Sequence, residues 1–133
     1  MNNLLKFVYI FFISNLIVCC GSTTFSDHRI QELSSMIKSK KFNMAEEFLS
    51  KNSGLDVNTL NENEETLLEL AIQSNNLEGF KWLLKNGANP NIITKERLSS
   101  VMKLASEHEN PEYLIQAILY KGDANLSHRS GEN

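Results

Sequence analysis

Few residues of this 133-residue chain have the type and spacing that catalysis or metal binding requires. The three histidines, His28, His108 and His128, do not share the spacing of a metal site, and the only two cysteines, Cys19 and Cys20, lie near the N-terminus. The chain also holds no G-x-S-x-G, H-E-x-x-H, P-loop or G-x-G-x-x-G motif. We therefore predict a protein that is not an enzyme and that uses no metal and no cofactor.

The composition is that of a folded, mildly acidic chain. Hydrophobic residues make up 41% of it and charged residues 22%, which is typical of globular rather than disordered proteins. The net charge is −3 and lysine and arginine form no cluster, so nucleic acid is not an expected partner. The length is that of a single domain.

The first residues have the pattern of a secretory signal peptide. Lys6 and the amino terminus supply positive charge, and a nearly unbroken apolar run follows over residues 7–18. As a helix this run would span about 18 Å, short of the roughly 30 Å hydrocarbon core of a membrane. We expect residues 1–19 to direct export and to be removed; an uncleaved membrane anchor is the alternative.

The end of this run, Ile17-Val18-Cys19-Cys20-Gly21-Ser22, resembles the lipobox of bacterial lipoproteins. The resemblance implies that Cys20 receives the lipid, because a small residue precedes it; Cys19 is the alternative, although bulky Val18 precedes that residue. It also implies a lipoprotein of the bacterial cell envelope that faces the periplasm, with residues 20–27 as a tether. The choice between inner and outer membrane stays open.

Beyond the tether, the chain repeats with a period of about 33–34 residues. The segment Thr66–Ala71 recurs one period later as Ser100–Ala105, and Asn89-Pro90-Asn91 recurs as Asp123-Ala124-Asn125. Asp56-Val57-Asn58 stands one period before the first of these two turns. We expect a domain over residues 28–127, with units at about 29–61, 62–94 and 95–127, followed by a flexible tail at 128–133.

Each unit is predicted to form two helices joined by a tight turn. In the central unit Thr66 and Glu69 have the spacing of a capping box at a helix start. Asn75 tolerates the left-handed backbone that a helix–helix turn needs, and Gly87 is a typical residue just past the end of a helix.

Polar residues also mark helix starts in the outer units. Ser26 or Asp27 is suited to cap the first helix, and Asn43 with Glu46 predicts a second capping box. Asn110 precedes a proline, which is favoured at the first position of a helix.

The central unit, TLLELAIQSNNLEGFKWLLKNGANPN, resembles an ankyrin repeat. Thr66–Ala71 stands where that family has Thr-Pro-Leu-His-x-Ala, with leucine and glutamate in place of its proline and histidine. Trp82-Leu83-Leu84 matches its leucine triplet, and Gly87–Asn91 matches its Gly-Ala-Asp-Pro-Asn turn. The resemblance implies an all-α, ankyrin-repeat-like solenoid of three helix-turn-helix units, with Trp82 in the core. About three units are the minimum for a stable stack.

The resemblance also implies that the protein binds another protein, of unknown identity, through the concave surface formed by turns and first helices. Acidic residues of one turn, with two basic residues of the next, are the candidates for contacting it: Asp56, Glu62, Glu64, Glu65, Lys95 and Arg97. A solubilising loop is the alternative reading of the acidic group. The membrane is contacted only through the lipid, and no small-molecule substrate is expected. An immunity-type inhibitor of a periplasmic toxin and an accessory subunit of a cell-envelope enzyme are the alternative functions.

Overall fold

The computed structural model describes residues 24–94 and 99–125. Six helices lie within these residues and form three helix-turn-helix pairs. They are α2 (His28–Lys38), α3 (Phe42–Lys51), α4 (Leu67–Gln73), α5 (Leu77–Lys85), α6 (Val101–Glu107) and α7 (Glu112–Leu119). A short hairpin, β1 (Ile93–Thr94) paired antiparallel with β2 (Ser99–Ser100), precedes α6. None of the described helices is long and apolar enough to cross a membrane.

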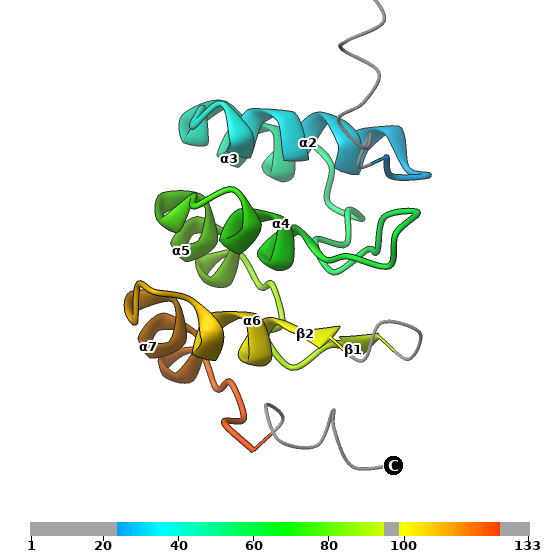
Figure 1. Ribbon diagram of the computed structural model, residues 1–133. Helices are drawn as coiled ribbons and strands as arrows, with labels where there is room; N and C mark the ends of the chain where they lie inside the picture. Colours follow the sequence, from blue (N-terminus) through cyan, green and yellow to red (C-terminus); the bar gives the residue numbers. More distant parts are fainter. Residues whose placement is uncertain (1–23, 95–98, 126–133) are drawn as a thin grey trace, which may run out of the picture.

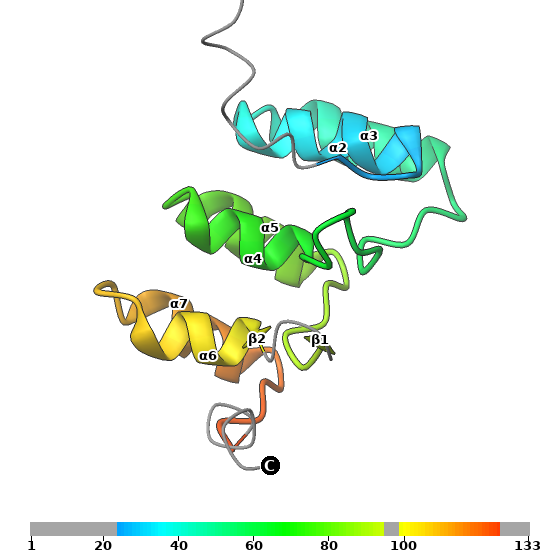
Figure 2. The same cartoon turned by 45° about the vertical axis from the view of Figure 1, so that its right-hand side comes forward.

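The three pairs stack in the order of the chain. We call α2/α3 unit 1, α4/α5 unit 2 and α6/α7 unit 3; units 1 and 3 form the two ends of the stack, with unit 2 between them (Figures 1 and 2). The loops that connect the units project to the right-hand side of the stack in Figure 1. The predicted all-α repeat fold is confirmed.

Side chains that cap their own backbone begin several of these helices. Thr66 Oγ1 accepts a bond from Glu69 N at 3.1 Å, and Glu69 Oε2 accepts one from Thr66 N at 2.8 Å, so the capping box of α4 is confirmed. Asp27 caps α2. At α7 the cap position falls on Pro111, which makes no side-chain cap bond, and Asn110, one residue earlier, accepts a bond at Oδ1 from the backbone N–H of Glu112 at 3.0 Å.

The second capping box, at Asn43 and Glu46, was predicted wrongly. Helix α3 begins at Phe42, and Lys41 in the cap position makes no side-chain cap bond. The reason lies in the preceding turn, where Lys40 has a φ of 57° and Lys41 N donates to a carbonyl in the last turn of α2. This turn starts the helix before Asn43, which therefore lies inside its first turn.

The predicted left-handed turn residues are found at the central unit. Asn75 has a φ of 54° between α4 and α5, and Gly87 has a φ of 93° after α5. After α7 the left-handed residue is Lys121, with a φ of 66°. The following Gly122 has a different role, because a Cβ there would lie 2.5 Å from the sulfur of Met102.

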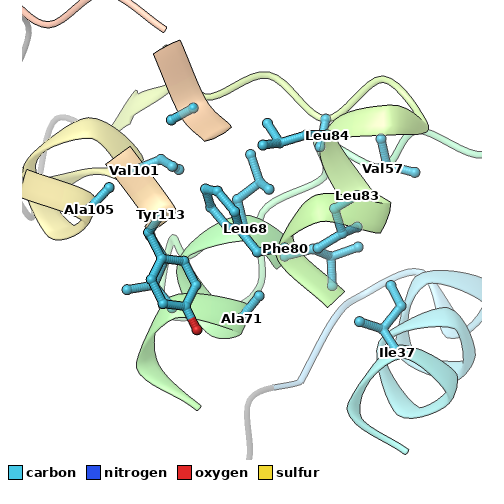
Figure 3. Close-up of a cluster of buried hydrophobic side chains, with 14 of the residues drawn as sticks. Ile37, Val57, Leu68, Ala71, Phe80, Leu83, Leu84, Val101, Ala105 and Tyr113 are labelled. Carbon is cyan, nitrogen blue, oxygen red and sulfur yellow. The ribbon is translucent and has the colours of Figure 1, made fainter. Parts of the chain in front are cut away.

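The core is one continuous cluster of buried side chains that runs through all three units. Leu68, Phe80 and Leu83 of unit 2 are each less than 2% exposed, and Figure 3 shows them gathered with Tyr113 and Val101 of unit 3. The Phe80 and Tyr113 rings meet edge to face with centroids 5.1 Å apart. Stacking therefore buries what a single helix pair would leave exposed.

Trp82 packs against this core without lying in it, which corrects the prediction. The indole is half-buried and stacks on the Phe42 ring of unit 1, with centroids 6.3 Å apart and planes 26° apart. Phe80, two residues earlier, fills the fully buried position instead. The side chain that faces the core is set by the rotation of α5, which the leucine-triplet match does not resolve.

Asparagine side chains also join the units, at the turns that follow each second helix. Asn58 Oδ1 accepts from Asn89 N at 2.7 Å, and Asn58 Nδ2 donates to Gly87 O at 3.4 Å. Asn91 makes the same pair of bonds to the turn that follows α7, at 2.7 and 2.9 Å. We call each of these bond pairs a rung; each runs from one unit to the next along the chain.

Candidate protein-binding surface

A groove of about 220 Å³ opens between α2 and α4, the first helices of units 1 and 2. Its residues come from both helices and from the turn that follows α4. They are Ser34, Ile37, Lys38, Leu67, Leu70, Ala71, Gln73, Ser74 and Asn76.

The groove has an apolar floor and a polar edge. Ile37, Leu67 and Ala71 are buried, whereas Lys38 and Gln73 are exposed. A binding surface with an apolar centre and hydrogen-bonding groups around it is the usual arrangement at protein interfaces. The groove is therefore suited to hold an apolar side chain of a partner and to bind the polar groups beside it.

Asn76 and Gly79 hold the two walls of the groove together. Asn76 Nδ2 donates to Ile37 O at 3.0 Å, and Asn76 Oδ1 accepts from Gly79 N at 3.0 Å. A Cβ on Gly79 would lie 2.8 Å from the Cγ2 atom of Ile37, so glycine allows the close approach of α5 to unit 1. The sequence motifs did not indicate this junction, because Asn76 and Ile37 lie 39 residues apart in the chain.

Glu65 is the one predicted contact residue whose position contradicts its assignment. It is only 7% exposed, and its carboxylate accepts hydrogen bonds from Asn61 Nδ2 at 2.9 Å and from Gln73 Nε2 at 3.1 Å. The Glu65 side chain thus ties the connecting loop to α4 and is not available to a partner. The cause is its place beside the helix cap, where the loop turns the side chain inward.

The other acidic candidates lie at or near the surface of the loop. Asp56 and Glu62 are exposed and Glu64 is half-buried. Asp56 Oδ1 accepts from Asn58 N at 2.9 Å, and Glu62 binds Thr24 through both its backbone and its side chain. Asp56 and Glu62 thus leave an acidic edge that is smaller than predicted. Lys95, Arg97, Cys19 and Cys20 lie outside the described residues.

Glu69 is a buried carboxylate that the sequence reading treated only as a cap. The residue is 1% exposed, and Oε1, the oxygen not used in the capping box, has no hydrogen-bond partner among the described residues. Over residues 24–94 and 99–125, no three side chains of His, Cys, Asp or Glu come together in a way that could hold a metal ion.

The comparisons with known proteins give one result. The family model described as ankyrin repeats (many copies) matches residues 36–105, which is 70 of the 133 residues and more than half of the chain. No curated protein and no solved structure matched. The match spans both helices of unit 2 and the rung of Asn58, the features that build the stack described above. The chain belongs to the ankyrin-repeat family, whose repeats serve in protein–protein interaction.

Proposed function

We propose that this chain is an exported, lipid-anchored ankyrin-repeat protein that binds a partner protein through the groove between α2 and α4. The observation that carries the proposal is the groove itself, with its buried apolar floor and exposed polar edge. It lies on the side of the first helices, and its lining extends to the last turn of α2 and to the turn that follows α4.

The exposed carboxylates of Asp56 and Glu62 favour a partner that also carries basic residues, which would face the loop between units 1 and 2. Exposed charges of opposite sign raise the association rate more than the final affinity. The apolar floor would supply most of the affinity, through removal of a partner side chain from water.

Leu70 offers a direct test, because the chain holds its own matched control. Leu70 lines the groove on α4 and is half-buried. Leu104, at the same position of the next repeat on α6, is also half-buried and does not line the groove. A photo-crosslinking residue at position 70 of the full chain should capture a partner that the same residue at position 104 does not.

The captured partner is then purified and its affinity measured by calorimetry. Leu70→Glu should weaken binding at least tenfold, about 1.4 kcal/mol, and Leu104→Glu should leave it unchanged. Equal capture at both positions, or equal affinities of both variants, would reject the groove as the site.

Export and anchoring are supported by the signal-like residues 1–19 and by the cysteines that follow. Thr24 O accepts from Glu62 N at 2.9 Å, so a residue only four positions after Cys20 is held to the folded domain. A lipid on Cys20 would hold the domain close to the membrane. Lipid chains contribute about 0.8 kcal/mol per buried methylene, so several chains anchor firmly.

Substitution of the two cysteines tests the anchor. Cys20→Ser should release the protein from the membrane fraction and abolish incorporation of labelled palmitate, whereas Cys19→Ser should do neither. If both variants stay in the membrane, an uncleaved apolar helix is the better explanation. Loss of anchoring only in Cys19→Ser would move the lipid to the neighbouring residue.

A further inference from the structure

Helix α7 leaves a row of apolar side chains open to water at the end of the stack. Ile115 and Ile118 are each 47% exposed, Leu119 is 68% exposed and Tyr120, just past the helix, is 42% exposed. The last unit of a repeat protein ordinarily has a polar outer face, because nothing covers it. This end of the stack is apolar instead.

The same positions in unit 2 form the interface with unit 3. Leu84 stands one repeat before Ile118 and is only 2% exposed. Lys81 stands one repeat before Ile115, and its Nζ lies 3.3 Å from the carboxylate of Glu112 at the start of α7. Helix α7 thus presents outward the surface through which α5 contacts the next unit.

The series of rungs is also unfinished at this end. Asn125 follows Asn58 and Asn91 at the same position of the repeat, and its backbone N–H is held by Asp123 Oδ1 at 2.9 Å, as the N–H of Asn91 is held by Asn89. In the part of the chain that the structure describes, the Asn125 side chain makes no hydrogen bond. The third asparagine of the rung series therefore has no turn to bind within the described residues.

At the opposite end of the stack, unit 1 carries the counterpart of the surface on α7. In units 2 and 3, the residue at this counterpart position is a glutamate, Glu78 or Glu112, whose carboxylate lies 3.3 Å from a lysine of the preceding unit, Lys40 or Lys81. Met44 occupies the same position in unit 1 and is 53% exposed.

The turn of unit 1 is equally ready to receive a rung. The N–H of Asp56 corresponds to the N–H groups of Asn89 and Asp123 that receive rungs, and no hydrogen bond within the described segments uses it. A turn that could receive a rung therefore stands free at one end of the described stack, and an asparagine that could extend one stands free at the other.

We infer that two copies of this chain associate head to tail, with unit 3 of one copy stacked on unit 1 of the next. The contact continues the interface already present between units 2 and 3. Ile115 would meet Met44 of the second copy where Lys81 meets Glu112 inside the chain, and Asn125 would bind the Asp56 turn. Because the two surfaces differ, the association is not closed by symmetry and forms linear chains of copies.

A photo-crosslinking residue at position 118 of the full chain tests the geometry in membranes of cells that express it. We expect dimers and longer species, with the crosslink mapped to α3 or to the 55–58 turn of a second, isotope-labelled copy. Crosslinks from α7 to α7 would overturn the inference in favour of a symmetric dimer. Crosslinks to residues 126–133, to a different protein, or to nothing would overturn it as well.

An exchange of side chains tests the proposed pair. Ile115→Lys should lower the crosslink yield about tenfold, because an unpaired ammonium group would face an apolar side chain. Adding Met44→Glu should restore the yield to within about threefold, since it recreates the Lys81–Glu112 pair. Ile93→Lys, at an exposed apolar residue of the β1–β2 hairpin rather than of α3 or α7, should change nothing.

Three results would reject the pairing: no loss in Ile115→Lys, no rescue in the double variant, or an equal loss in Ile93→Lys. The three substituted positions, 44, 93 and 115, and the crosslinking position 118 are all exposed, and circular dichroism checks that each variant keeps its helices. This association needs neither a partner in the groove nor a lipid on Cys20. If the copies do not associate, the proposed function is therefore unaffected.

Discussion

At the scale of single residues, Asn76 stabilises the junction between units 1 and 2 in two ways. It caps α5 through Gly79 N, and it satisfies the carbonyl of Ile37 across the junction. Both bonds are buried, so neither group would gain water if the side chain were removed.

We expect Asn76→Ala to lower the free energy of unfolding by about 1 kcal/mol for the lost cap and by about 1–3 kcal/mol for the unsatisfied carbonyl. Asn110→Ala is the matched control: Asn110 Oδ1 accepts from the first backbone N–H of α7 but the residue is exposed, so its loss should cost only about 1 kcal/mol. Urea unfolding followed by circular dichroism measures both. Equal losses would mean that the bond to Ile37 adds nothing.

Gly79 makes the same junction sensitive to a single methyl group. In Gly79→Ala the new Cβ would lie 2.6 Å from Asn76 Nδ2 and 2.8 Å from Ile37 Cγ2. Alanine favours the helix by about 1 kcal/mol, but crowding of this kind costs about 1–3 kcal/mol, so we expect net destabilisation. Thermal melts measure this loss. Gly54→Ala, with no atom within 4 Å of the added Cβ, should leave the melting temperature unchanged. A Gly79→Ala variant as stable as the parent would contradict the close packing of units 1 and 2.

At the scale of elements, the rungs are hydrogen bonds that connect the turn of one unit to the turn of the next. Asn91→Ala removes both bonds between the turns of units 2 and 3, each worth about 0.5–1.5 kcal/mol in a typical protein. Asn125→Ala removes the equivalent side chain where no next unit exists within the chain. We expect a lower unfolding midpoint for Asn91→Ala alone, in dilute protein. A similar loss in Asn125→Ala would show that the rung is not the cause.

A charged contact between α5 and α7 makes the stack sensitive to acid. Hydrogen bonds from Gln116 and then from Lys81 hold the pKa of Glu112 below its ordinary value of 4.5. The folded state thus favours the charged carboxylate, and its stabilising effect is present above the ordinary pKa and is lost as the pH falls through the lowered one.

We therefore expect Glu112→Gln to melt below the parent at pH 7 and to converge with it near pH 3. Glu109→Gln, at an exposed residue of the turn before α7, should follow the parent at both pH values. Melting curves that keep the same separation at pH 3 would show that the charge of Glu112 is not what stabilises the contact.

At the scale of the whole molecule, local signals were sufficient to predict the stack. Its period, the capping box at Thr66 and Glu69, and the left-handed turn at Asn75 each depend on residues close together in the chain. Such signals act on the backbone directly, so the sequence reports them reliably.

Two of the features predicted wrongly depend on which way a side chain turns once the helices and loops are in place. Glu65 turns inward because Asn61 and Gln73 stand ready to bind it, and Trp82 is left at the edge of the core because Phe80 occupies the centre. The groove between α2 and α4 arises from two helices that lie about one repeat apart in the chain. No spacing within a single unit encodes this contact between two units, so the candidate groove needed the structure.

The rungs give the molecule a direction, and that direction has a consequence for its length. Unit 2 both receives a rung from Asn58 and extends one through Asn91. Consider a duplicate of residues 62–94 inserted after residue 94. Its turn would be in register to receive the rung from Asn91, and its own copy of Asn91 would be in register to bind the turn that follows α7. The architecture can therefore grow by simple tandem duplication of its middle segment, without redesign of either terminus.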